Sequence, residues 1–349
     1  MTLRIRHETL KLQLREPFLI ARSDHDAGQF VTTVIVALED DRFPGVMGVG
    51  EGYPDRFYGD TPETMAAVYP FLLAAIGEPD PSPDGLRSAG DKMHDAIRWN
   101  GGAKCAIDSA LHDLVGKVTG RPVWDLLGLS PVIPPTDFTL GLDEPAVVAE
   151  RAKRAAAFPA LKIKCGGPAD LATLGAVREV FNGPIRVDAN TGWTPEIARA
   201  LVPDLVALGV ELIEQPFPAA RLDWMADLQQ FTELPIVADE SCVTDEDLDG
   251  LVGVVAGVNV KLAKVGGPGP AARMLARAGD LGFRRFLGCM EETSVLIAAS
   301  AACASLAEWV DLDGCLLLAD DPFEGLMLGP DHRWQITEGP GLGVRRATA

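Results

Sequence analysis

From about residue 136 to residue 313 the chain repeats one pattern, in which a short apolar run precedes a longer stretch of helical periodicity. We predict the apolar runs to be strands, at residues 136–140, 161–165, 185–188, 211–214, 236–239, 258–261, 286–289 and 309–313. Helical patterns, such as those at residues 169–181, 195–208 and 270–278, lie between them. Alternating strands and helices form right-handed βαβ units with a parallel sheet. The pattern therefore predicts an α/β fold with a closed TIM-type (β/α)7β barrel.

The first 125 residues follow a different pattern. Strand-like alternation at residues 3–14 and 31–38 precedes helical stretches at residues 62–76 and 103–118. This order predicts a separate α+β domain at residues 1–125, ahead of a barrel at residues 126–322. The remaining residues, 323–349, contain no further strand–helix unit, and we expect them to pack back on the first domain.

Charged residues collect where the predicted barrel strands end, which is the end that carries catalytic groups in barrels of this kind. Lys164, Asp188, Glu214, Asp239 and Lys261 follow one another at intervals of 24, 26, 25 and 22 residues. Each interval is about one βα unit, so these residues should occupy equivalent positions on successive strands. A single charge at a strand end is usually a solvated terminus, but that explanation does not account for a whole set in register.

The types of these residues suggest a chemistry. Three neighbouring carboxylates repel one another unless a cation lies between them, and oxygen ligands favour Mg²⁺ or Mn²⁺ over zinc. Lys164 and Lys261, half a turn apart in an eight-stranded barrel, should face each other across its mouth. Two bases on opposite sides of one carbon can invert it, and a metal can stabilise the intermediate enolate. Lys162 shares a strand face with Lys164, and we expect its charge and that of the metal to lower the pKa of the base.

Composition narrows the possible partners and location. The formal net charge of −19 argues against a nucleic-acid partner, because phosphate-binding surfaces need clustered Lys and Arg. The six cysteines form no C-x-x-C pair, as expected for reduced thiols. The start of the chain lacks the apolar region of a signal peptide, and the longest apolar stretch is shorter than the roughly 20 residues that span a bilayer. We expect a cytoplasmic protein without membrane contact, either monomeric or a homo-oligomer.

These residues resemble the enolase superfamily, in its muconate-lactonizing subgroup, over nearly the whole chain. The K-x-K signature of that subgroup matches Lys162-Ile163-Lys164, and its metal ligands match Asp188, Glu214 and Asp239. Its second base matches Lys261 in the segment 259–267, where Lys264 is a nearby competitor but the Asn-x-Lys spacing ahead of the glycine pair favours Lys261. The resemblance implies Mg²⁺ as the cofactor and a first domain that caps the barrel.

Within the subgroup, residues 288–294 and the motif Asp311-Leu312-Asp313 resemble dipeptide epimerases of the L-Ala-D/L-Glu type. The resemblance implies that the two aspartates hold the α-ammonium of a dipeptide whose C-terminal α-carbon is inverted. Loops 20–29 and 51–60 should cover the barrel mouth. Further substrate contacts are implied for Met290, Glu292, Asn190, Arg22, His25 and Arg56.

Several alternatives remain open. His25 stands where L-Ala-D/L-Glu members tend to carry a second arginine, so another L-Xaa-L-Xaa dipeptide also fits. An N-acylamino acid racemase, an o-succinylbenzoate synthase or a cycloisomerase of the same subgroup would use the same lysines on substrates without a free amine. A dehydratase on the same scaffold, and a metal-binding barrel without catalysis, are the remaining hypotheses.

Overall fold

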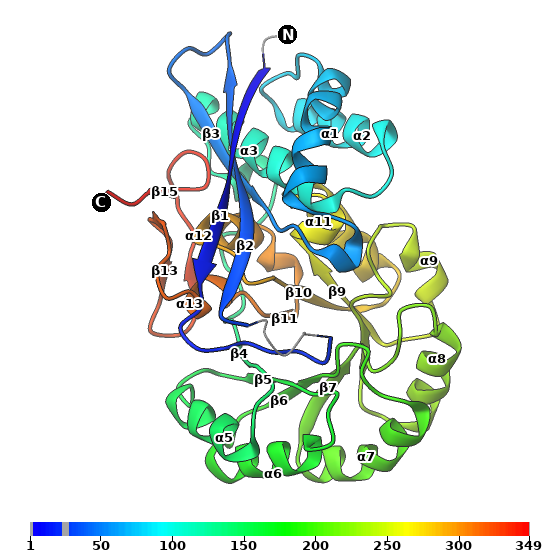
Figure 1. The fold of residues 1–349 in the computed structure, drawn as a ribbon. Helices are drawn as coiled ribbons and strands as arrows, with labels where there is room; N and C mark the ends of the chain where they lie inside the picture. The colour runs from blue at the N-terminus through cyan, green and yellow to red at the C-terminus, as the bar shows by residue number, and fades with distance from the viewer. Residues whose placement is uncertain (1–2, 23–27, 349) are drawn as a thin grey trace.

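The centre of the molecule is an eight-stranded parallel barrel, which confirms the predicted fold (Figure 1). The computed structural model describes residues 3–22 and 28–348. The strands, in the order of their neighbours, are β4 (Phe138–Leu140), β5 (Leu161–Lys164), β6 (Ile185–Asp188), β7 (Val210–Glu214), β8 (Ile236–Ala238), β9 (Gly257–Lys261), β10 (Arg284–Gly288) and β11 (Trp309–Val310). A hydrogen bond from Asp137 N to Val310 O, at 2.9 Å, joins the start of β4 to β11 and closes the barrel.

Helices connect the strands on the outside of the barrel. They are α5 (Pro145–Arg154), α6 (Asp170–Val180), α7 (Pro195–Ala207), α8 (Leu222–Phe231), α9 (Asp247–Leu251), α10 (Leu262–Val265), α11 (Pro268–Asp280) and α12 (Ser294–Ala301), with the 3-10 turn η2 (Ala304–Leu306) and, after β11, α13 (Gly314–Leu317). Local sequence explains their starts: at α7 the Thr194 side chain accepts a hydrogen bond from Ile197 N, and Pro195 occupies the first helical position.

Four barrel strands, β4, β5, β8 and β11, are shorter than predicted, and at two of them the difference leaves site residues outside the strand. β8 ends at Ala238 and β11 at Val310, so Asp239, Asp311 and Asp313 lie just beyond the strands. The reason is that, near the ends of β8 and β11, some backbone groups form hydrogen bonds with side chains and not with the backbone of the neighbouring strand. The Asp239 N–H donates to Gln215 Oε1 at 2.9 Å, and Asp313 accepts the Thr139 N–H at 2.6 Å. These carboxylates are therefore placed on short, hydrogen-bonded turns.

The N-terminal part forms an antiparallel sheet with helices on one side. Its strands are β1 (Leu3–Gln13), β2 (Phe30–Asp40) and β3 (Met47–Gly52), followed by η1 (Arg56–Tyr58), α1 (Pro62–Ile76), α2 (Pro83–Ala96), α3 (Gly101–Thr119) and α4 (Val123–Leu126). A hydrophobic core of its own lies between the sheet and the helices. In the following text this part is called the cap, because it lies over one end of the barrel (Figure 1).

The sequence pattern did not reveal strand β3, because glycines occupy every second position. A Cβ atom at Gly48, Gly50 or Gly52 would lie 2.1 Å from a backbone oxygen of α3, at Ala110, Ala106 and Gly102 respectively. Glycine alone permits this approach, so the strand presents no apolar alternation and is held by close packing against the helix.

The C-terminal tail forms two small antiparallel pairs, β12 (Phe323–Glu324) with β15 (Arg345–Arg346) and β13 (Met327–Leu328) with β14 (Trp334–Gln335). It contacts both parts of the molecule. Leu342 N donates to Asp113 of α3 at 2.9 Å, whereas Trp334 Nε1 donates to Leu312 O beside the barrel at 2.9 Å. Among the described residues, no helix is both long and apolar enough to cross a membrane.

A buried glutamate connects the cap to the barrel. Glu51 of β3 accepts hydrogen bonds from Thr293 N at 3.0 Å and from Leu296 N at 3.1 Å, both at the start of α12. The hydroxyls of Thr33 and Thr293 donate to the same carboxylate. Glu51 thus occupies the N-terminus of a barrel helix, which favours its charge, but burial outweighs this effect and raises the pKa of Glu51.

We predict that Glu51→Ala lowers the free energy of unfolding by about 3 kcal/mol, because several buried donors lose their acceptor. Urea denaturation of the wild type and the variant would measure it. Glu51→Gln retains the side-chain volume and one acceptor oxygen, so it should cost less. Equal stability of Glu51→Ala and wild type would contradict this account.

A second prediction concerns pH and Asp60, which accepts the N–H of Gly102 at 2.9 Å at the start of α3. Burial raises the pKa of Asp60 from 3.8 to about 6. The ionised carboxylate is therefore less stable in the folded state than in the unfolded chain. This penalty is absent below the unfolded pKa of 3.8, grows as the pH rises above it and is complete above 6. The wild type should gain about 2 kcal/mol relative to Asp60→Asn when the pH falls from 7.5 to about 4.5. Urea denaturation across this range, with Asp84→Asn as an exposed control, would test the sign.

Candidate active site

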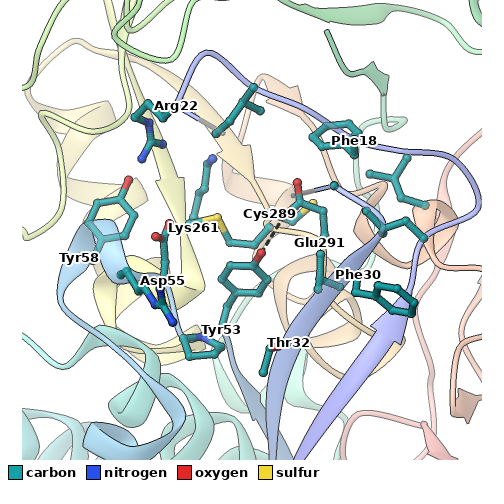
Figure 2. Close-up of a pocket in the computed structure, with 18 of the residues that line it drawn as sticks. Phe18, Arg22, Phe30, Thr32, Tyr53, Asp55, Tyr58, Lys261, Cys289 and Glu291 are labelled. Atoms are coloured by element: carbon teal, nitrogen blue, oxygen red, sulfur yellow. Dashed lines mark hydrogen bonds between the residues drawn. The ribbon is translucent and has the colours of Figure 1, made fainter. Parts of the chain in front are cut away.

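A cavity of about 850 Å³ lies between the cap and the C-terminal ends of the barrel strands (Figure 2). Loop residues of the cap and residues at the strand ends line it together. From the cap these include Phe18, Arg22, Phe30, Tyr53, Asp55, Arg56 and Tyr58. From the barrel they include Thr139, Lys164, Asn190, Lys261, Cys289, Met290, Glu291, Asp311 and Asp313.

Three buried carboxylates converge at the barrel end of this cavity. Asp188, Glu214 and Asp239 come from the ends of β6, β7 and β8, and each offers an oxygen within 4.8 Å of the other two. All three ligand atoms are carboxylate oxygens, the donor type that suits a hard divalent cation such as Mg²⁺ or Mn²⁺. The convergence that the sequence intervals predicted is thus present, and the donor set fits the expected metal.

Repulsion between the carboxylates contributes to the pKa shifts of the triad. Burial, and after it the Asp188 carboxylate, raises the pKa of Glu214 to about 7. For Asp239 burial acts in the same direction, but Lys261 and Lys264 outweigh it and hold the pKa well below its usual value. Positive side chains therefore already balance much of the negative charge.

Lys162 lies beneath the cavity wall and contacts several carboxylates. Its Nζ is 2.9 Å from Glu214 Oε2, 2.9 Å from Asp311 Oδ2 and 3.2 Å from Asp188 Oδ2. Burial alone would lower the pKa of Lys162, but these carboxylates outweigh burial and raise it well above its usual value. Lys162 is therefore a fixed positive charge between the triad and Asp311.

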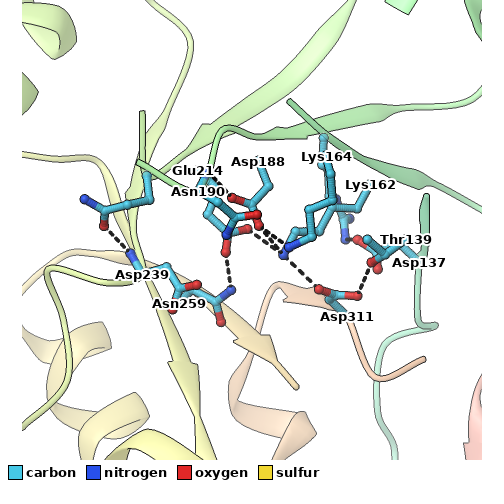
Figure 3. A network of polar contacts seen from close by, with 12 residues as sticks. Asp137, Thr139, Lys162, Lys164, Asp188, Asn190, Glu214, Asp239, Asn259 and Asp311 are labelled. Carbon is cyan, nitrogen blue, oxygen red and sulfur yellow. Dashed lines mark hydrogen bonds and ion pairs between the residues drawn. The ribbon is translucent and has the colours of Figure 1, made fainter. Parts of the chain in front are cut away.

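Lys164 and Lys261 lie on strands four positions apart in the eight-stranded barrel, and both line the cavity. Lys164 Nζ is 2.7 Å from Asp188 Oδ2, and Lys261 Nζ is 2.9 Å from Asp239 Oδ2. Figure 3 shows Lys162 and Lys164 beside Asp188, with Asp239 on the opposite side of the triad. The two lysines therefore flank the carboxylates from opposite directions.

The expected effect of Lys162 on the pKa of the base is outweighed by other charges at Lys261. Burial and the Lys162 charge both lower the pKa of Lys261, but Asp239 together with Glu214 and Asp188 outweighs them and the net shift is upward. The sequence argument had the right sign for Lys162 and omitted the carboxylate 2.9 Å away.

Lys264, the competitor of Lys261, points away from the cavity. Its buried ammonium donates to Asp239 Oδ1 at 2.5 Å and to three backbone oxygens, those of Asp239, Cys242 and Asn259. All its donors are thus used within the protein. Lys264 positions Asp239 and is not available to a ligand.

The two aspartates after β11 lie beside Thr139 of β4. Thr139 Oγ1 donates to Asp311 Oδ1 at 2.9 Å, and Thr139 N donates to Asp313 Oδ2 at 2.6 Å. Burial raises the pKa of Asp313 and Asp311 raises it further, whereas Lys162 outweighs burial at Asp311 and lowers its pKa. This pair of buried acids lines the cavity and can accept a cationic group.

The structure places some of the remaining predicted substrate contacts in the cavity and others outside it. Arg22, Arg56, Asn190 and Met290 line the cavity, and His25 lies outside the described residues. Glu292, which we expected to contact a substrate, lies behind the cavity wall. Its Oε2 accepts the Met290 N–H at 3.2 Å, and burial raises its pKa well above its usual value. The carboxylate that lines the cavity at this bend is that of Glu291.

Several site residues were not predicted from the sequence. Glu240, directly after Asp239, accepts Arg22 at 2.8 Å and Asn190 at 3.3 Å, so it ties the first cap loop to the barrel. The Tyr53 hydroxyl, also from the cap, donates to Glu291 at 3.0 Å. The acidic cluster 239–240 was a signal for Glu240, but its pairing with residue 22 required the folded chain.

The cap, the barrel and the charged strand ends define the protein as a two-domain α/β-barrel enzyme. Residues 1–128 match the mandelate racemase / muconate lactonizing enzyme N-terminal domain, and residues 146–347 match the enolase C-terminal domain-like family. The chain therefore belongs to the enolase superfamily, in its mandelate racemase / muconate lactonizing enzyme branch.

Similar proteins include dipeptide epimerases. The L-Ala-D/L-Glu epimerase of Bacteroides thetaiotaomicron is 35% identical over 96% of this chain and 86% of its own. The hydrophobic dipeptide epimerase of Enterococcus faecalis is 34% identical over 96% of both chains. The crystal structure of the Enterococcus faecalis V583 dipeptide epimerase complexed with Mg and the dipeptide L-Leu-L-Tyr superposes with a TM-score of 0.88, at 32% identity and covering 99% of each chain.

Proposed function

We propose that this protein is a Mg²⁺-dependent dipeptide epimerase that inverts the α-carbon of the C-terminal residue. The observation that carries the proposal is the placement of Lys164 and Lys261 on opposite sides of the carboxylate triad in one cavity. One lysine removes the α-proton, and the other donates a proton to the opposite face. The relatives and the neighbouring structure support this function because they are named as dipeptide epimerases.

Asp188, Glu214 and Asp239 would hold the metal. A divalent cation there supplies positive charge that stabilises the carboxylate oxygens of the substrate as the α-proton leaves. With such a cation bound, Lys261 would share the negative charge of Asp239 with it, which would favour the neutral amine that a base needs. Lys162 stays protonated and adds a fixed positive charge next to the triad.

A free α-ammonium distinguishes a dipeptide from an N-acyl amino acid. Asp311 and Asp313 place two buried carboxylates in the cavity, and such a pair stabilises a cationic amine but not a neutral amide nitrogen. This favours a dipeptide over the substrates of N-acylamino acid racemases and cycloisomerases.

The charges near Arg22 bear on which C-terminal side chain of the dipeptide the enzyme prefers. Glu240 already pairs with this guanidinium, which also lies over the Phe57 ring at 4.2 Å. Its charge is therefore compensated within the protein, which argues against Arg22 as a receptor for an acidic side chain. We propose that Arg22 does not select a C-terminal glutamate, so that Arg56, which also lines the cavity, is the described arginine for an acidic side chain.

Incubation of pooled L,L-dipeptides with the enzyme and Mg²⁺ in D₂O, followed by mass spectrometry, tests the function. A one-dalton gain in particular dipeptides would show α-proton exchange, and chiral chromatography would show inversion. The same dipeptides with an acetylated N-terminus are the matched control, because they lack the ammonium. Equal exchange in both sets would replace the dipeptide assignment by an N-acylamino acid racemase.

A further inference from the structure

A second cavity, of about 220 Å³, lies between the barrel and the segment that follows strand β1. Its walls are largely apolar and come from β4, the end of α5, the loop behind it and α13. They include Phe138, Leu140, Ala155, Phe158 and Leu316. We call it the side cavity.

The side cavity adjoins the candidate active site. Phe18, Thr139 and Leu317 line both spaces, so these side chains are the partition between them. In Figure 2, Phe18 lies at the end of the main cavity away from Arg22 and Tyr58. The partition thus lies at one end of the substrate space.

Thr139 connects the partition to the ammonium site. Its hydroxyl and its backbone N–H donate to Asp311 and Asp313, at 2.9 and 2.6 Å. A dipeptide held by these aspartates has its N-terminal α-carbon next to the partition. The side chain attached to that carbon is then the part of the substrate closest to the side cavity.

The charged groups around the side cavity are already paired with one another. Glu16 accepts Arg151 Nε at 2.6 Å and also pairs with Arg154, and Arg15 Nε donates to Leu316 O at 3.0 Å. These contacts connect the charged residues at the rim of the side cavity to one another, so a ligand inside the cavity would contact mainly its apolar walls. An aliphatic or aromatic group therefore fits better than a charged one.

We propose that the side cavity is a subsite for the N-terminal side chain of the dipeptide, and that it selects large apolar residues. Phe18 turns aside when such a side chain enters, and its ring then contributes to the wall. Burial of that side chain strengthens binding and helps to hold the C-terminal α-carbon of the dipeptide between the two lysines. This inference rests on the proposed dipeptide epimerase function and adds the identity of the first residue.

The test compares kcat/KM for L-Phe-L-Xaa, L-Leu-L-Xaa and L-Ala-L-Xaa, with one accepted second residue throughout. In the wild type we expect the first two to exceed the third by about tenfold or more. Ala155→Phe fills the side cavity from the end of α5 and should remove this preference while changing the L-Ala dipeptide by less than about twofold. Ala156→Phe is the matched control, because the neighbouring alanine is exposed and should leave all three values unchanged.

Phe18→Ala gives a second test, which does not depend on the folding of Ala155→Phe. It removes the partition and should increase kcat/KM for an L-Trp dipeptide relative to the L-Leu dipeptide. Equal kcat/KM for all first residues in the wild type, or an equal loss for all of them in both variants, would overturn the subsite. A wild-type enzyme that exchanges no dipeptide α-proton would instead refute the proposed function itself.

Discussion

Replacement of either Lys164 or Lys261 by alanine is expected to lower kcat for epimerisation by at least about 10³-fold, while one-sided proton exchange survives. Inversion needs a proton donor on the face opposite to the base, and each lysine approaches the triad from its own side. In a single variant the remaining lysine still removes the α-proton from the epimer that it faces. It can return a proton only to that same face, so the configuration is retained.

Proton NMR in D₂O, started separately from the L,L and L,D dipeptides, would measure both reactions. The Lys164 and Lys261 variants should exchange opposite epimers, and the double variant should exchange neither. Lys153→Ala is the surface control, and circular dichroism would establish that all variants are folded. Inversion at a similar rate in both single variants would falsify the two-base assignment.

Removal of divalent cations is expected to abolish turnover but leave the fold intact. The loss should be at least about 10³-fold, because the metal supplies several kcal/mol of charge stabilisation. The fold should persist because the triad has internal counterions. Lys162 and Lys164 pair with Asp188, Lys162 also pairs with Glu214, and Lys261 and Lys264 pair with Asp239.

Activity after EDTA treatment, with the metal content verified by elemental analysis, would test the first part of this prediction. Mg²⁺ or Mn²⁺ should restore activity and raise the melting temperature of the treated enzyme by mass action. Glu214→Gln removes one charged ligand and should require much more Mg²⁺ for any recovery. Full activity in metal-free enzyme would contradict the metal's role in turnover.

The barrel was predictable because its signal is local and repeated. Most buried strands contain a short apolar run, as at residues 236–238, and the crossovers show helical periodicity, as at residues 195–207. Strand β3 was not predictable, because its glycines fit against α3 and leave no alternation to detect. Helix α2 (Pro83–Ala96) was also missed: its buried residues Leu86, Ala89, Gly90 and Met93 follow helical spacing, but two of the four are small and its mean hydropathy is low.

The residue types and their spacing along the chain were sufficient to predict that the triad, the two lysines that flank it and the aspartate pair lie at one end of the barrel. The regular length of a βα unit places equivalent positions of successive strands side by side, so sequence distance translates directly into proximity. The choice of Lys261 over Lys264 rested on the Asn-x-Lys spacing of the family, because the two lysines are three residues apart and both are buried. Hydrogen bonds to backbone oxygens orient Lys264 away from the cavity, and the sequence carries no record of them.

Three further features could not be predicted from the sequence. They are the pairing of Arg22 with Glu240, the position of Glu291 rather than Glu292 in the cavity, and the side cavity behind Phe18. These features depend on contacts between the cap and the barrel, whose loops follow no period, and such contacts exist only once the two parts of the chain have packed together.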